Sequence, residues 1–122
     1  MDKTRAIIAD PSQTFLEGVR AMIEELFDYV VMVADERSMI DASRKLGVDL
    51  VLVDMSIGAR VLGDAVRTIK ADFPSLKVIV MSSHDESAAL GFVLKQSAAT
   101  ELIPAIEEVM AGGSFFPDHK KV

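Results

Sequence analysis

Hydrophobic residues gather in four short runs along the chain. These are residues 5–9 (RAIIA), 29–33 (YVVMV), 50–53 (LVLV) and 78–81 (VIVM). The runs are rich in β-branched residues and nearly continuous, whereas a strand with one solvated face alternates apolar and polar positions. They therefore predict strands that are buried on both faces of a parallel sheet.

Between and after these runs, apolar residues recur every three or four positions, as on one face of a helix. The four stripes are Phe15, Val19, Met22 and Leu26; Met39, Ala42 and Leu46; Leu62, Ala65, Val66, Ile69 and Phe73; and Leu102, Ile106, Val109 and Met110. Helix ends are predicted at Gly47, at Pro74 and at Gly112-Gly113. This alternation predicts an α/β domain with a doubly wound parallel sheet and right-handed crossovers. Because no repeat or linker divides the chain, we expect one domain over residues 1–122.

The connection after the fourth run is unusually short. The next candidate strand is residues 91–94 (GFVL), and only nine residues, 82–90, precede it. A parallel crossover that contains a helix needs at least about 10–12 residues. Either the fourth crossover helix is shortened or missing and the sheet has five strands, or residues 91–94 are helical and it has four. We favour five strands, because Gly, Phe and Val are poor helix formers and residues 97–100 offer capping chemistry for a helix after Lys95.

Composition narrows the class of protein. The 122 residues carry a net charge of −6 and include no cysteine. The acidic balance disfavours direct nucleic-acid binding, and the lack of cysteine excludes thiol catalysis and Cys-ligated zinc. No run reaches the roughly 18–20 apolar residues of a membrane span, and the first residues have no apolar signal-peptide core. We therefore expect a soluble cytoplasmic domain that does not contact a membrane.

Polar residues follow the predicted strands where their carboxyl ends should meet. Asp10 follows the first strand, Asp54 the third, Ser82 the fourth and Lys95 the fifth, with Ser83 as a rival to Ser82. Ligands of open α/β sheets bind at this edge. Carboxylates suit Mg²⁺, an ammonium and a hydroxyl suit a phosphoryl group, and a carboxylate is also a nucleophile that forms aspartyl phosphate. The sequence has no glycine-rich phosphate loop, no G-x-S-x-G and no H-E-x-x-H.

Asp10 and some other polar or aromatic residues also have a simpler, structural interpretation. Asp10 could cap a helix that starts at Pro11, and this role is compatible with metal binding. His84, beside Asp85, has no second histidine nearby, so we interpret it as a solvated loop residue. For Phe115 and Phe116, an interface and packing of the chain end remain equally open.

Several segments, in order, resemble the receiver domains of two-component response regulators, in the branch usually joined to a helix-turn-helix output domain. The segments are IIADPSQTFLEGVRAMI, DLVLVDMSIG, VIVMSSHDE, GFVLKQSA and EEVMAGGSFFP. The resemblance implies a flavodoxin-like topology. It places the phosphoacceptor on Asp54, the switch hydroxyl on Ser82, the phosphate-binding lysine on Lys95 and the aromatic of the fifth strand on Phe92.

The resemblance also implies a metal and partners. Mg²⁺ would be bound, weakly, by Asp10, Asp54 and the main-chain carbonyl of Ser56. A histidine kinase or phosphotransfer protein would donate the phosphoryl group. The domain would signal to a downstream protein or a fused output domain, with a homodimer possible. It would be a signalling module rather than an enzyme, either a single-domain regulator or a receiver excised from a longer protein.

The sequence departs from the family pattern at several positions. The usual pair of acids after the first strand is Asp10-Pro11 here, and the usual Lys-Pro after the fifth strand is Lys95-Gln96. The loop after Asp54 usually contains Met-Pro and then Asp-Gly, and here it reads MSIGARVL. The shortened fourth crossover also alters the surface that receivers commonly use to signal and dimerise. These departures support an alternative, a degenerate receiver that acts as a phosphorylation-independent interaction or dimerisation module. A small flavodoxin-like ligand binder or hydrolase is a third, weaker interpretation.

Overall fold

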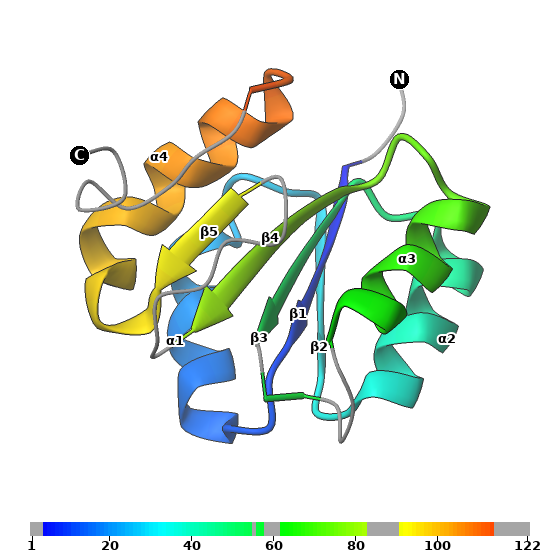
Figure 1. Cartoon of the computed structure of the whole chain (residues 1–122). Coiled ribbons are helices and arrows are strands. Elements are labelled where there is room, and N and C mark those ends of the chain that lie inside the picture. Colours follow the sequence, from blue (N-terminus) through cyan, green and yellow to red (C-terminus); the bar gives the residue numbers. More distant parts are fainter. Residues whose placement is uncertain (1–3, 55, 58–61, 83–90, 114–122) are drawn as a thin grey trace.

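A parallel sheet of five strands forms the centre of the molecule (Figure 1). The computed structural model describes residues 4–54, 56–57, 62–82 and 91–113. The strand order is β2-β1-β3-β4-β5, and every neighbouring pair is parallel. The strands are β1 (Arg5–Ala9), β2 (Tyr29–Val33), β3 (Leu50–Asp54), β4 (Lys77–Ser82) and β5 (Gly91–Leu94). This is the order of flavodoxin-like doubly wound folds, so the predicted fold class is confirmed.

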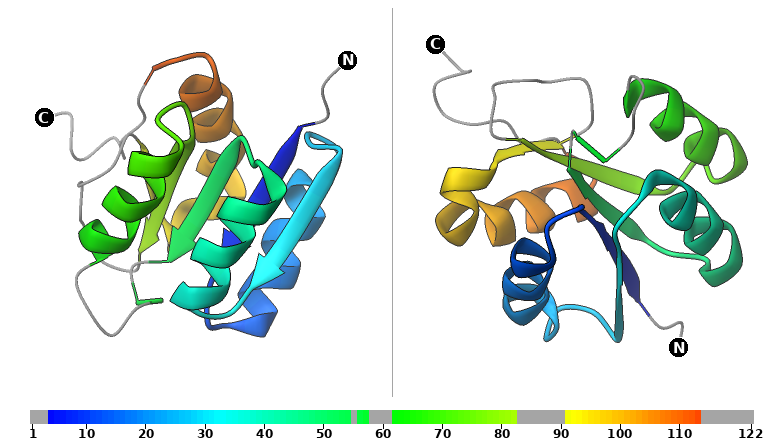
Figure 2. Two further views of the ribbon diagram at one scale, coloured as in Figure 1. Left: turned by 90° about the vertical axis from the view of Figure 1, so that its right-hand side faces the viewer. Right: turned by 90° about the horizontal axis from the view of Figure 1, so that it is seen from below.

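Helices cover both faces of the sheet (Figure 2). They are α1 (Gln13–Ile23), α2 (Glu36–Leu46), α3 (Leu62–Asp72) and α4 (Ala98–Met110), with a short 3₁₀ turn, η1 (Lys95–Ser97), before α4. One core cluster joins residues of α1 and α4 to the sheet, and the other joins residues of α2 and α3 to its opposite face. In the described part of the chain, no helix is long and apolar enough to cross a membrane.

Burial follows the position of each strand in the sheet. Nearly all side chains of β1, β3 and β4 are buried, as the continuous apolar runs predict. The prediction of burial on both faces is wrong for β2, whose residues are exposed or only partly buried. The reason is its place at an edge of the sheet, where β1 is its one neighbouring strand.

The ends of the helices correct several predicted core positions. Leu26, Leu46 and Met110 are 43%, 38% and 37% exposed, although each continues an apolar stripe. Leu26 lies beyond the end of α1, and the other two are the last residues of their helices. The apolar period thus runs on at the helix ends into positions that the core does not cover. The predicted stops at glycine are confirmed, with φ of +60° at Gly47 and +98° at Gly112.

The start of α1 corrects the predicted capping role of Asp10. The helix begins at Gln13 rather than at Pro11, and Ser12 is its N-cap residue. The Ser12 hydroxyl accepts a hydrogen bond from the N–H of Phe15 (3.2 Å). Asp10 is therefore not the cap, and Pro11 precedes the cap instead of occupying the first helical turn.

The short fourth crossover joins two directly paired strands. Ile79 of β4 pairs with Gly91 of β5, and Ser82 pairs with Leu94. Residues 91–94 are thus a strand, and the four-stranded alternative is wrong. The predicted loss of the helix falls on residues 83–90, which lie outside the described residues, as do Ser83, His84, Asp85, Phe115 and Phe116. The side chain of Phe92 is also outside them.

Candidate functional site

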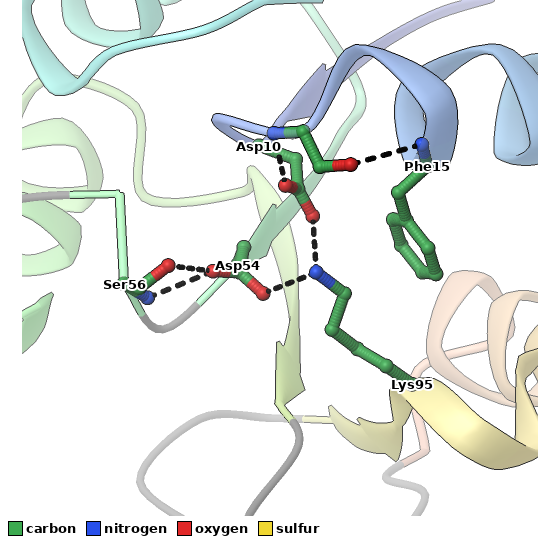
Figure 3. Close-up of polar contacts among 6 residues, drawn as sticks. Asp10, Phe15, Asp54, Ser56 and Lys95 are labelled. Atoms are coloured by element: carbon green, nitrogen blue, oxygen red, sulfur yellow. Dashed lines mark hydrogen bonds and ion pairs between the residues drawn. The ribbon is translucent and has the colours of Figure 1, made fainter.

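Three of the predicted site residues, Asp10, Asp54 and Lys95, lie together at the carboxyl ends of the strands (Figure 3). Asp10 follows β1, Asp54 is the last residue of β3, and Lys95 follows β5. The Lys95 Nζ lies 2.9 Å from Asp10 Oδ2 and 3.0 Å from Asp54 Oδ1. One ammonium thus bridges two carboxylates that are 44 residues apart in the chain, because the parallel topology brings both strand ends to the same edge.

The bridge is largely shielded from water. Asp10 is fully buried, Asp54 is 5% exposed, and the Lys95 side chain is 21% exposed. Burial lowers the pKa of Lys95, but its hydrogen bonds and attraction to Asp10 and Asp54 outweigh this, and the pKa lies above its usual value. Lys95 therefore stays protonated at neutral pH and offsets part of the repulsion between the two anions.

Each carboxylate is also held by a serine two residues further along the chain. Asp10 Oδ1 accepts the N–H of Ser12 (2.8 Å), and Asp54 Oδ2 accepts the N–H of Ser56 (2.9 Å). The Ser56 hydroxyl makes a second, short hydrogen bond to Asp54 Oδ2. The prediction considered only the main-chain carbonyl of Ser56 and missed these donors. The repeated Asp-x-Ser pattern is the signal that could have found them, since Asp side chains often accept the backbone N–H two residues on.

These donors keep Asp54 ionised. Burial raises the pKa of Asp54, but hydrogen bonds from Ser56 and Lys95 stabilise the charged form more, so the pKa lies below its usual value. The Asp54 carboxylate is consequently an anion at neutral pH, as a nucleophile requires.

Ser82 lies at the same edge of the sheet. It is the last residue of β4, is 3% exposed, and sits on the strand between those that carry Asp54 and lead to Lys95. This placement agrees with its predicted position beside the carboxylates.

An aromatic ring that the sequence did not predict also lies beside Lys95. The centroid of the Phe15 ring lies 4.2 Å from Lys95 Nζ. The sequence placed Phe15 in the apolar stripe of the first helix, and it does pack against the core there. Nothing in the spacing of Phe15 indicates that its ring also faces a lysine 80 residues away.

The donor set fits a weakly held Mg²⁺. Two buried carboxylates converge on one cation, and Mg²⁺ in proteins is commonly bound by one or two carboxylates together with water and phosphate oxygens. Within the described ranges, no group of three or more Asp, Glu, His or Cys residues could hold a metal ion by itself. A site built here would therefore depend on Asp10 and Asp54, with water or phosphate supplying the other oxygens.

Comparison with known proteins places this arrangement in a family. The model of the response regulator receiver domain matches residues 6–107. The chain belongs to the receiver domain family. Receiver domains are components of response regulators in two-component systems, and the predicted family is confirmed.

Relatives of this receiver domain include longer transcriptional regulators. It is 31% identical to the transcriptional regulatory protein DegU of Brevibacillus brevis, over 99% of this chain and 55% of the relative. It is also 31% identical to the transcriptional regulatory protein RcsB of Escherichia coli K12, over 97% and 61%. The crystal structure of the non-phosphorylated receiver domain of E. coli RcsB superimposes with a TM-score of 0.81 at 28% identity, over 96% of this chain and all of that one. The chain thus spans 55–61% of the length of these two regulators.

Proposed function

We propose that this receiver domain accepts a phosphoryl group on Asp54 from a histidine kinase or a phosphotransfer protein. The observation that carries the proposal is the ionised Asp54 carboxylate, buried at the sheet edge beside Lys95 and Asp10. An anionic nucleophile next to a fixed cation is the arrangement that transfer of a phosphoryl group to a carboxylate needs.

One Asp54 carboxylate oxygen attacks the phosphorus of a phosphohistidine, a P–O bond forms, and the P–N bond breaks. The nitrogen keeps the bonding electron pair, and the imidazole ring takes up one proton from water. In this proposal Lys95 and Ser82 donate hydrogen bonds to the phosphoryl oxygens.

Mg²⁺ fits the same site. Asp10 and Asp54 would hold it, with the Ser56 carbonyl as a third protein ligand, and it would neutralise charge between the carboxylates and the phosphoryl group. The phosphoryl group stays on the protein as a signal, so the domain is a signalling module and not a metabolic enzyme. Phosphorylation changes the contacts of the strand-end residues, and a downstream partner or fused output domain reads that change.

Intact-mass measurement tests the proposal. Incubation with acetyl phosphate and Mg²⁺ is expected to add one phosphoryl group to the wild type and none to Asp54→Asn. Asp49→Asn is the matched control, because Asp49 lies just before the same strand and its carboxylate accepts the N–H of Arg5 (2.9 Å). This control should be phosphorylated like the wild type. Absence of any mass gain in the wild type, with acetyl phosphate and with a histidine kinase, would refute the proposal.

The second candidate is a degenerate receiver that acts as a phosphorylation-independent interaction or dimerisation module. Pro11, in place of the second acid, favours it, because proline offers no side-chain oxygen to Mg²⁺. The ion pairs of Lys95 also give Asp10 and Asp54 a structural role without phosphate. The same mass measurement separates the two candidates.

A further inference from the structure

The contact between Phe15 and Lys95 completes a closed chain of contacts that runs from Asp10 through Ser12, Phe15 and Lys95 back to Asp10 (Figure 3). Asp10 accepts the Ser12 N–H, and the Ser12 hydroxyl accepts the Phe15 N–H. The Phe15 ring then faces the ammonium of Lys95, which is itself paired with Asp10. The position of the ring is therefore fixed relative to one of the carboxylates that Lys95 contacts.

The geometry gives the ring a specific effect on the ammonium. A lysine ammonium has three N–H donors, and among the described residues Lys95 Nζ is within hydrogen-bond distance of two carboxylate oxygens, one on Asp10 and one on Asp54. An aromatic face within about 6 Å attracts a cation, and the attraction grows when the cation is shielded from water. At 4.2 Å, beside a lysine side chain that is 21% exposed, Phe15 meets both conditions.

The surface around this pair shows what the ring excludes. Phe15 and Lys95 line a groove of about 460 Å³ between α1 and the start of α4. A smaller or flexible side chain at position 15 would let water reach the ammonium from this groove and compete with the carboxylates for its donors. The flexible four-carbon stem of lysine would then sample more conformations.

We propose that Phe15 is a positioning residue, whose ring face holds the Lys95 ammonium between Asp10 and Asp54 and aims it at the phosphoryl group. The part that concerns the phosphoryl group rests on the proposed function. The positioning of Lys95 is independent of it. Phe15 does not touch the reacting atoms and acts through Lys95.

NMR of the unphosphorylated domain tests the positioning directly. The mobility of the Lys95 side chain is the readout, and relaxation of its ε-methylene carbon reports it independently of the ring current that Phe15 itself produces. The order parameter of that carbon should be high in the wild type and should fall in Phe15→Leu, which keeps an apolar side chain but loses the ring. Phe15→Tyr should restore the wild-type value. An unchanged order parameter in Phe15→Leu would overturn the proposal, because the ion pairs alone would then fix the lysine.

The rate of phosphorylation by acetyl phosphate is the second readout. We expect Phe15→Leu to slow it about fivefold to tenfold, in keeping with the strength of a cation–π contact to a partly desolvated ammonium, and Phe15→Tyr to be nearly as fast as the wild type. Met22→Leu is the matched control, since Met22 lines the same groove from α1, and it should change neither readout. Equal slowing in Phe15→Leu and Met22→Leu would reduce Phe15 to a packing residue.

The two readouts separate this inference from the proposed function. A wild type that gains no phosphoryl group refutes the function, and the NMR comparison then still decides whether Phe15 positions Lys95. Should Phe15→Leu fail to fold, Phe15→Met removes the ring with a more adaptable side chain and takes its place.

Discussion

Replacing Lys95 with methionine should destabilise the domain far more than breaking a surface ion pair. Lys95 is the shared partner of two carboxylates whose side chains are 1% and 7% exposed. Two carboxylate oxygens that share one nitrogen lie on the order of 5 Å apart, and at an effective dielectric constant of about 20 their repulsion is about 3 kcal/mol. Removing one partner of a buried ion pair typically costs about 3–5 kcal/mol. Because one carboxylate can take up a proton in response and Lys95 is partly exposed, we expect a loss of about 2–3 kcal/mol at pH 7.

The assay is urea unfolding followed by circular dichroism at several pH values. Arg44→Met is the control, because Arg44 pairs with Asp72 at 3.0 Å with both side chains about half exposed, and such pairs contribute about 0–1 kcal/mol. The difference between wild type and Lys95→Met should shrink as the pH falls toward 4, where protonation relieves the unpaired anions of the variant. The wild type keeps the stability contributed by the lowered pKa of Asp54 over most of this range and loses it at lower pH, as the pH falls from the ordinary carboxyl pKa toward the lowered one.

Two results would refute this reasoning. One is a Lys95→Met variant that is no less stable than Arg44→Met. The other is a destabilisation that stays constant from pH 8 to pH 4, since lost packing of the lysine stem is independent of pH whereas lost charge pairing is not.

Two further predictions concern the neighbours of the carboxylates. Ser56→Ala removes the hydroxyl donor to Asp54 but keeps the backbone N–H, so the pKa of Asp54 should rise. The acid limb of the pH–rate profile of phosphorylation should then move to higher pH. An unmoved limb would contradict the hydrogen bond from Ser56 as a cause of the lowered pKa. Pro11→Asp adds a carboxylate beside Asp10 and should tighten Mg²⁺ about tenfold to thirtyfold, equivalent to about 1–2 kcal/mol. Mg²⁺ titration compares it with the wild type, and equal affinity would mean that Asp10 and Asp54 do not form the proposed pocket.

Much of the fold could be predicted because burial and chain connection leave few alternatives. The four apolar runs and the candidate strand at residues 91–94 place the five strands to within one residue at each end, since continuous β-branched runs are typical of a parallel sheet. The length of the fourth connection left a strand and a helix both open at residues 91–94, and the poor helix propensity of Gly, Phe and Val favoured the strand. The exposed Leu26, Leu46 and Met110 could not be predicted, because a helical period does not reveal where the sheet beneath it ends.

Part of the candidate site could also be predicted from the sequence, and part could not. The meeting of Asp10, Asp54 and Lys95 follows from the rule that parallel strands end at one edge. The start of α1 did not follow, because Asp10 could cap a helix or accept the N–H of Ser12, and only the folded chain decides between them. The contact of Phe15 with Lys95 depends on how α1 is rotated against the sheet, which a helical period fixes only to the nearest face.

The sharing of one lysine by two aspartates makes substitutions at the three positions unequal. A variant without Asp10 or without Asp54 leaves Lys95 with one remaining partner. A variant without Lys95 leaves two buried anions without their shared cation. A variant of this chain without Asp54 would therefore still need Lys95 in order to fold, because Asp10 stays buried beside it. The presence of Lys95 is consequently weak evidence for phosphorylation, and the presence of Asp54 is stronger evidence.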